Sequence, residues 1–237
     1  MSNKKTVLIT GATRGIGKGI ALAFADAGYH VYGTGRNLSG SEWATQKKIH
    51  LKEADVTDPA RMSEIMTEIK ATHGALDCLI NNAGIASNSP ASALTQEEIQ
   101  NIIAVNFKGV FECCQSYYKL QRKAGGNIIN VSSVLGIVGT SLASVYSGTK
   151  GAVIAMTRAL AIEWAGSGFR VNAICPGFID TDMTEMIKKR ENLMKKLIDV
   201  IPQKRLGTPV DIAGPTLFLA SDAAGYMTGQ RSSSMAE

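Results

Sequence analysis

The chain has 237 residues, of which 45% are hydrophobic and 19% are charged, as in an ordinary water-soluble globular protein. This length can bury a sizeable core in one α/β domain, or at most in two small ones. The net charge of +5 is mild, and no basic patch alternates with aromatic residues, so the composition disfavours a nucleic-acid-binding protein but suits a phosphorylated cofactor or an acidic partner protein.

Apolar runs that predict strands alternate along the chain with segments that predict helices. The expected strands cover residues 6–10, 30–34, 51–56, 76–81, 127–131 and 169–175. The expected helices cover residues 18–27, 60–73, 95–122, 145–164 and 209–220. Thr95 and Glu98 form a capping box at the start of the third helix.

This alternation predicts an α/β fold, a doubly wound parallel sheet with helices on both faces. No linker, repeat or low-complexity tract divides the chain, so we expect a single domain over residues 1–237. The segment 177–206 contains a stretch that is longer than an ordinary connection, which predicts a functional or mobile loop.

The N-terminal apolar run, which begins at Thr6, is too short for the core of a signal peptide or for a membrane span. We therefore expect a cytoplasmic protein that does not contact a membrane. The four cysteines and three histidines lack the spacing of metal ligands, so we expect free thiols and no metal site.

The first strand runs into a glycine-rich turn, Gly11-x-x-x-Gly15-x-Gly17, and a helix follows. Glycines let the backbone turn tightly toward a pyrophosphate, and the helix N-terminus offers free N–H groups to negative charge. The turn therefore predicts a dinucleotide site. Its spacing differs from the common G-x-G-x-x-G, so a plain strand–helix turn remains an alternative.

The end of the second strand indicates which dinucleotide binds. Residues 34–37 read TGRN, and no acidic residue follows before Glu42. An acidic residue there would bind the ribose hydroxyls of NAD, whereas Arg36 can accept a 2′-phosphate, with Arg14 as a second cation. We predict NADP(H), with ordinary solvated arginines as the alternative.

Tyr146 and Lys150 lie four residues apart in a predicted helix, so their side chains share one face. An ammonium group beside a phenol is expected to lower the pKa of Tyr146, which could then exchange a proton with a carbonyl or alcohol oxygen. Ser133 follows a buried strand and could meet Tyr146 where the strands end. Such a pair alone is more often a packing pair, and the independent glycine turn is what gives it weight.

The chain carries these motifs in a characteristic order: the glycine turn, Asn-Asn-Ala-Gly at residues 81–84, Asn106, Ser133, Tyr146 and Lys150. With this set it closely resembles the short-chain dehydrogenase/reductase family over residues 6 to 229, nearly its whole length. The resemblance implies that Tyr146 is the general acid, that Lys150 lowers its pKa and holds the nicotinamide ribose, that Ser133 orients the substrate carbonyl, and that Asn106 binds a water in the proton relay.

The glycine turn, the cations and the resemblance together predict a set of cofactor-binding residues. These are Gly11, Thr13, Arg14, Gly15, Ile16, Gly17, Arg36, Asp55, Val56, Asn82, Ala83, Gly84, Tyr146, Lys150, Pro176, Gly177, Ile179 and Thr181.

Within the family, residues 176–184 and 226–230 look most like β-ketoacyl carrier-protein reductases. The resemblance implies NADPH-dependent reduction of a 3-oxoacyl thioester of fatty acid biosynthesis, in a catalytic domain whose substrate loop is 177–206. The thioester's acyl carrier protein would then be a partner. Sugar, polyol, alcohol and steroid dehydrogenases share much of the pattern. A non-catalytic NADP(H)-binding regulatory protein is a further alternative, which the intact Ser133, Tyr146 and Lys150 disfavour.

Two features depart from these reductases. Ser167 stands where a basic residue implicated in carrier docking is often found in those reductases. A cationic cluster at residues 188–196 could contact an acidic carrier protein instead. The favoured interpretation of that cluster is a solvated helix face. Residues 231–237 lack a strand pattern, so we expect a last strand that is short, misplaced or absent, a less ordered 177–202 segment and a weakened tetramer.

The resemblance also implies a homodimer or homotetramer that pairs through the helices expected at 95–122 and 145–164. Apolar residues at positions 110, 111, 154, 157 and 161 are the expected contact surface.

Overall fold

Seven strands form one parallel sheet in the computed structural model, which describes residues 4–87 and 89–233. The strands are β1 (Thr6–Ile9), β2 (His30–Gly35), β3 (His50–Glu53), β4 (Cys78–Asn81), β5 (Gly126–Val131), β6 (Phe169–Cys175) and β7 (Arg231–Ser233). Their spatial order is β3-β2-β1-β4-β5-β6-β7. The order runs one way from β1 and the other way from β4, so the predicted α/β fold is confirmed as a Rossmann-type doubly wound sheet.

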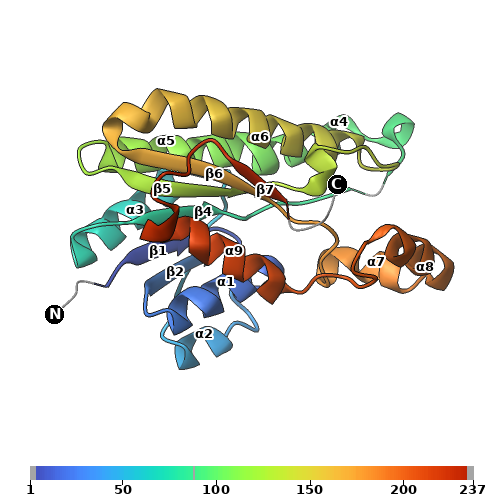
Figure 1. Ribbon diagram of the computed structural model, residues 1–237, viewed down its shortest axis with the longest axis horizontal. Helices are drawn as coiled ribbons and strands as arrows, with labels where there is room; N and C mark the ends of the chain where they lie inside the picture. Colours follow the sequence, from blue (N-terminus) through green and yellow to red (C-terminus); the bar gives the residue numbers. More distant parts are fainter. Residues whose placement is uncertain (1–3, 88, 234–237) are drawn as a thin grey trace.

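Helices cover both faces of this sheet (Figure 1). One face carries α1 (Gly15–Asp26), α2 (Trp43–Gln46) and α9 (Pro209–Ala220), and the other carries α3 (Pro59–His73), α5 (Gly109–Gln121) and α6 (Ser144–Trp164). α4 (Gln96–Ile103) leads into α5 through a π-helical turn at Ala104–Lys108. Short 3-10 turns occur at Ala91–Ala93, Val134–Gly136, Ala165–Ser167, Asp182–Thr184 and Asp222–Ala224.

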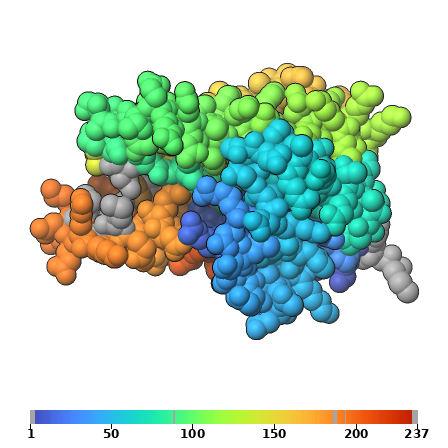
Figure 2. Space-filling view, turned by 180° about the vertical axis from the view of Figure 1, so that it is seen from behind, coloured from blue at the N-terminus to red at the C-terminus, as the bar shows by residue number. Residues whose placement is uncertain are grey.

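Two further helices, α7 (Glu185–Lys188) and α8 (Glu191–Val200), project from one end of the molecule and are orange in the view from behind (Figure 2). They lie within the segment that the sequence predicts only as a long connection. Both are short and charged: α7 has only four residues, and the apolar spacing of α8 continues for only about two turns, which makes these helices hard to predict.

The core consists of two apolar layers, because successive side chains of a strand point to opposite faces of a sheet. In β1, Leu8 packs with residues of α3, α5 and α6, while Val7 and Ile9 pack with residues of α1 and α9, and all three are fully buried. Each such side chain stabilises the fold by about 1.5–3 kcal/mol relative to an exposed one. The two layers hold the carboxyl ends of the strands in fixed relative positions.

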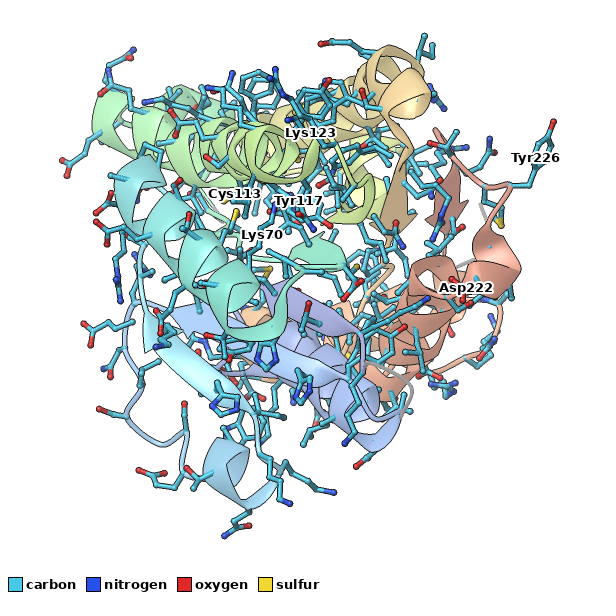
Figure 3. All side chains as sticks on the ribbon, turned by 90° about the vertical axis from the view of Figure 1, so that its left-hand side faces the viewer. Lys70, Cys113, Tyr117, Lys123, Asp222 and Tyr226 are labelled. Carbon is cyan, nitrogen blue, oxygen red and sulfur yellow. The ribbon has the colours of Figure 1, made fainter. Side chains whose placement is uncertain are left out.

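Hydrogen bonds reinforce the packing of α3 and α5. Tyr117 of α5 is fully buried and donates a hydrogen bond to the Leu76 carbonyl oxygen at 2.8 Å. Lys70 of α3 donates to the carbonyl oxygen of Leu120, the penultimate residue of α5, at 2.7 Å; both donors lie between these helices (Figure 3). The Leu76 oxygen also accepts a hydrogen bond from the Gln121 side chain at 2.7 Å, so two side chains of α5 bond to the chain just before β4.

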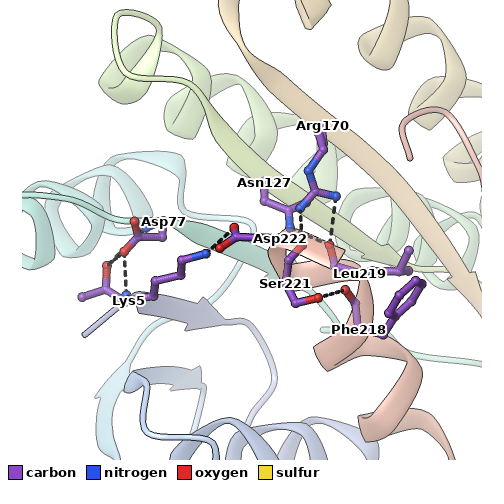
Figure 4. Close-up of polar contacts among 9 residues, drawn as sticks. Lys5, Asp77, Asn127, Arg170, Phe218, Leu219, Ser221 and Asp222 are labelled. Atoms are coloured by element: carbon purple, nitrogen blue, oxygen red, sulfur yellow. Dashed lines mark hydrogen bonds and ion pairs between the residues drawn. The ribbon is translucent and has the colours of Figure 1, made fainter. Parts of the chain in front are cut away.

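The carboxyl end of α9 is fixed by side chains from the sheet (Figure 4). Asn127 of β5 and Arg170 of β6 donate to the Leu219 carbonyl oxygen at 2.8 and 3.0 Å. An ion pair of 2.6 Å between Lys5 and Asp222 adds a contact at the neighbouring turn. These donors satisfy orphan carbonyls of the helix end and favour its negative dipole.

Several predicted boundaries agree closely with the structure. α9 coincides with the predicted helix 209–220, and the capping box of Thr95 and Glu98 is present. Other boundaries were wrong: the expected helix 18–27 begins at Gly15, and the strand expected at 76–81 begins at Cys78. The expected helix 95–122 is interrupted by the π turn, and the strand expected at 51–56 ends at Glu53, because Asp55 accepts a hydrogen bond from the Thr57 N–H and turns the chain.

The last strand forms over three residues, so the expectation of a short strand is confirmed for β7, which pairs with β6. Residues 234–237 of the expected atypical tail lie outside the described part of the chain. The expected subunit-contact surface needs correction: Val110, Ile154, Thr157 and Ala161 are at most 7% exposed because they pack inside the subunit. No helix in the described ranges is both long and apolar enough to cross a membrane.

Candidate active site

The carboxyl ends of the strands open onto a cavity of about 590 Å³. It contains most of the predicted site residues. The cofactor residues that line it are Gly11, Thr13, Arg14, Gly15, Ile16, Arg36, Asp55, Val56, Asn82, Ala83, Gly84, Pro176, Gly177, Ile179 and Thr181. The predicted catalytic residues Ser133, Tyr146 and Lys150 line the same cavity. Of the predicted set, Gly17 and Asn106 lie behind this lining, so they do not face the cavity directly.

The glycine turn is held by Asn82, the residue after β4. The Asn82 side-chain amide donates to the carbonyl oxygens of Thr10 and Gly11 at 3.0 and 2.9 Å, and the Thr10 hydroxyl accepts from the N–H groups of Asn82 and Ala83. Gly11 has a φ of +64°, and a Cβ atom on Gly17 would collide with the Gly11 carbonyl oxygen. The turn therefore requires glycine at both positions.

The beginning of α1 is suited to an anion. The helix starts at Gly15 without a side-chain cap and without an acidic residue in its first turn. Its N–H groups and the positive end of its dipole are thus available at the cavity wall. The two arginines of the cavity differ in their salt bridges. Arg14 pairs with Asp182 at 3.3 Å, whereas exposed Arg36 forms no salt bridge with any described residue.

Thr34, at the end of β2, offers a second polar feature. Its hydroxyl oxygen is buried and lacks a hydrogen-bond partner within the described part of the chain, and the residue lines the cavity. A buried polar atom of this kind is rare in a native protein and marks a place where a ligand or water can complete the bonding. Together with the uncapped helix and Arg36, it fits a dinucleotide that carries an additional phosphate.

Tyr146 and Lys150 occupy the first two turns of α6. Tyr146 is partly buried; burial raises the pKa of its hydroxyl, and a hydrogen bond with Ser133 acts in the opposite direction. The Lys150 ammonium nitrogen donates to the Val131 carbonyl oxygen at 2.8 Å and lies 5.8 Å from the Tyr146 ring centre. Burial lowers the pKa of Lys150 to about 8.

This geometry corrects one expectation. The sequence predicts that Lys150 lowers the pKa of Tyr146, but the structure shows a pKa raised by desolvation of the phenolate. The shared helical face brings the two side chains near each other, and the end of β5 then draws the ammonium group toward the Val131 carbonyl oxygen.

Asn106 is buried in the π turn and is tied to the loop after β4. Its side-chain oxygen accepts from the Ile85 N–H at 2.9 Å, and its amide nitrogen donates to the Ile85 carbonyl oxygen at 2.8 Å. The same nitrogen contacts the Thr149 hydroxyl at 3.3 Å, and Thr149 donates to the Tyr146 carbonyl oxygen at 2.7 Å. Asn106 therefore reaches Tyr146 through Thr149.

Three residues at the site were missed by the sequence reasoning. Thr34 and Thr149 are described above, and Ser132 donates from its hydroxyl to the Lys150 carbonyl oxygen at 2.8 Å. Ser132 and Thr149 contact main-chain atoms of the residues they support. In the sequence, the only indication of these supporting roles was that Ser132 directly precedes Ser133 and Thr149 directly precedes Lys150. In the described ranges no three His, Cys, Asp or Glu side chains are grouped to hold a metal ion.

Comparison with known proteins agrees with this site. A family model described as enoyl-(acyl carrier protein) reductase matches residues 11–233. The chain belongs to the short-chain dehydrogenase/reductase family. It is an oxidoreductase of this family, whose members use NAD(P)(H).

Its relatives differ in substrate. The chain is 39% identical to 3-oxoacyl-[acyl-carrier-protein] reductase FabG of Staphylococcus aureus (strain Mu50 / ATCC 700699), covering 97% of this chain and 96% of the relative. It is 37% identical to 2-dehydro-3-deoxy-D-gluconate 5-dehydrogenase of Pseudoalteromonas atlantica (strain T6c / ATCC BAA-1087), covering 95% and 92%. The solved structure of ElxO with NADP bound superposes with a TM-score of 0.90 at 34% identity, covering 97% of this chain and 96% of that one.

Proposed function

We propose that the protein is an NADPH-dependent reductase that converts a carbonyl group to an alcohol, and that its substrate is a 3-oxoacyl thioester of fatty acid biosynthesis. The observation that carries the proposal is that Ser133, Tyr146 and Lys150 line the same cavity as the glycine turn. A proton donor and a dinucleotide site therefore adjoin each other, as carbonyl reduction requires.

The choice of NADP(H) rests on the charge at the end of β2. Arg36 is exposed at the cavity and can bind a 2′-phosphate, while the first turn of α1 can receive the pyrophosphate. Arg14 is held by Asp182, so its contribution is smaller than that of Arg36. The structural relative ElxO, with NADP bound, supports the same cofactor.

The chain's own residues supply binding and the proton, and NADPH supplies the hydride when it is bound. Ser133 orients the carbonyl oxygen, and Tyr146 donates its hydroxyl proton to that oxygen. Because burial raises the pKa of Tyr146, the hydroxyl is protonated at neutral pH. Lys150 holds the ribose, while Asn106 holds a water that returns a proton to Tyr146.

The substrate class follows from the S. aureus relative, which is a 3-oxoacyl carrier-protein reductase. A second candidate is the oxidoreduction of a sugar, polyol or other alcohol, because the P. atlantica relative acts on a sugar acid at nearly the same identity. In both cases we propose one catalytic domain in which segment 177–206 is the substrate loop.

A turnover panel tests these alternatives. Purified protein with NADPH is given a 3-oxoacyl thioester, keto-sugars and simple diketones, and loss of NADPH absorbance is followed. We expect the thioester to have the highest kcat/KM. A keto-sugar that exceeds it would establish the second candidate, and no turnover of any carbonyl would support a regulatory protein that only binds NADP(H).

We further propose a cytoplasmic homodimer or homotetramer. Phe111 of α5, one of the residues first expected at this contact, is 37% exposed, while Ile103 of α4 and Ile162 of α6, at 42% and 82%, replace the expected residues that are buried. Exposed apolar side chains on neighbouring helices favour burial against a second copy. A monomer in sedimentation at micromolar concentration would contradict this proposal.

A further inference from the structure

The positive charge of this chain is concentrated in one segment. Residues 185–206 contain seven Lys or Arg and three Asp or Glu, which gives a net charge of +4, whereas the whole chain has +5. The other 215 residues are therefore nearly neutral. The segment contains α7 and α8 and projects as the orange region at one end of the molecule (Figure 2).

Some of these cations are engaged within the protein. Lys188 pairs with Asp180 at 2.7 Å and with Glu185 at 2.6 Å, and Arg205 pairs with Asp211 at 2.8 Å. These contacts attach the two ends of the segment to the loop after β6 and to the start of α9. These ion pairs neutralise two of the seven cations and hold both ends of the segment against the rest of the protein.

Lys204 donates a hydrogen bond to the Asp199 carbonyl oxygen, and the other four cations are free for an external partner. Lys189, Arg190, Lys195 and Lys196 are exposed and form no salt bridge with any described residue. With Glu191 among them, residues 189–196 carry a net charge of +3, so these cations repel one another and an acidic partner would relieve that repulsion. We call these four residues the cationic ridge.

The construction of α8 keeps part of this ridge outward. Met194, Leu197 and Ile198 are partly buried and Ile201 is 5% exposed, which is the 3–4 spacing of an apolar helix face. Lys195 and Lys196 lie between these apolar positions and are exposed. The packing of the helix therefore orients the cations toward solvent.

The segment that carries the ridge begins beside the cavity. Met183 lines the cavity and is 50% exposed, and α7 begins two residues later. Val200, at the end of α8, is 69% exposed. A partner seated on the ridge would meet apolar side chains as well as charge, and a group that it carries would be presented near the cavity entrance.

We propose that the cationic ridge docks an acidic carrier protein that presents the acyl group as a thioester. This inference rests on the proposed function, because it assigns a surface to the carrier of that substrate. Charge complementarity mainly accelerates encounter and selects the partner. A small thioester without a carrier makes no contact with the ridge, so the ridge affects only the carrier-linked substrate.

The experiment compares the same 3-oxoacyl group on purified acyl carrier protein and on N-acetylcysteamine. In the full-length double variant Lys195→Glu/Lys196→Glu, we expect kcat/KM for the carrier-linked substrate to fall at least about tenfold, mainly through KM. Lys195 and Lys196 lie in the proposed substrate loop but face solvent and do not line the cavity, so the value for the short thioester should stay within about twofold. Raising the salt concentration should weaken wild-type activity only on the carrier-linked substrate.

A matched variant, Arg122→Glu/Lys123→Glu, changes two adjacent exposed cations by the same charge just before β5, at the amino ends of the strands and away from the cavity. It should leave both substrates unaffected. The proposal is overturned if this variant loses as much carrier activity as the ridge variant, or if the ridge variant retains its carrier activity. Should the wild-type enzyme reduce neither thioester, the proposed function fails as well; reduction of the short thioester alone leaves that function standing and removes the docking surface.

Discussion

The first two turns of α6 and the segment 185–206 both adjoin the cavity, but they are constructed in opposite ways. In α6, Thr149 and Lys150 are buried, and hydrogen bonds reach them from Asn106 in the π turn and from Ser132 after β5. In the segment, the ridge cations are exposed and α8 packs mainly against α7. The difference indicates that the groups for proton transfer are held by several elements, whereas the groups for partner contact depend on charge and need little support.

The largest expected effect comes from removing one hydroxyl group in the buried region. Tyr146→Phe should lower kcat by about 10²–10⁴-fold, the usual contribution of general acid catalysis, while NADPH binding and thermal stability stay close to wild type. Steady-state kinetics and cofactor titration measure both. Tyr226→Phe is the control, because Tyr226 is fully exposed. Near-wild-type turnover in Tyr146→Phe would remove the proposed proton donor.

The buried charge of Lys150 should appear in the pH dependence of stability. Its pKa is lowered to about 8, below the unfolded value of 10.5, so the unfolded chain binds more protons between these values and stability increases with pH across this window. Lys150→Met removes the slope. The Met variant should be inactive, and its stability advantage over wild type should shrink by about 2 kcal/mol from pH 8 to 9.5.

Urea unfolding at several pH values measures this difference. Lys196→Met is the control at an exposed position and should leave the slope as in the wild type. A parallel pH dependence in the wild type and Lys150→Met would show that burial does not penalise this ammonium group.

Arg36 tests the cofactor half of the cavity. Arg36→Ala should lower kcat/KM for NADPH by about 10–100-fold, because a hydrogen bond to a charged group contributes about 1.5–3 kcal/mol, and NADH should be affected little. Arg14→Ala should have a smaller effect, since Asp182 already holds that guanidinium. Equal efficiency of wild type with NADPH and NADH would exclude the 2′-phosphate contact.

The smallest effect concerns the support of Tyr146. Thr149→Val keeps the shape of the side chain but removes its hydrogen bonds with Asn106 and with the Tyr146 carbonyl oxygen, so kcat should fall up to about tenfold with little change in KM. Thr149→Ser retains the hydroxyl and should recover most of the activity. If both variants have the same kcat, the hydroxyl does not position Tyr146.

The sequence predicted the elements that have a repeating apolar pattern or clear terminal residues. The strand–helix alternation predicted the sheet, and the helix predicted at 209–220 coincides with α9. The π turn was missed because the apolar spacing continues through residues 104–108. The three-residue strand β7 reads Arg-Ser-Ser, which has no strand propensity, and it forms because β6 offers a free edge.

The candidate site shows the same limit at the level of side chains. Spacing alone brought Tyr146 and Lys150 to one helical face, and the order of motifs brought Ser133 to the same cavity. Spacing could not predict that Lys150 bonds to Val131, because that contact depends on how α6 sits on β5. The supporting role of Thr149 was equally hidden, since its partner is a main-chain oxygen.

The π turn between α4 and α5 has a consequence for the rotational phase of the long helical segment. A π turn contains about one residue more than an α turn, and one α-helical residue corresponds to a rotation of about 100°. With the turn in place, Asn106 faces Ile85 while Cys113 and Tyr117 of α5 still face the core. Deleting a single residue there would turn one of these two faces away, so the extra residue keeps the catalytic and structural halves of the helix in register.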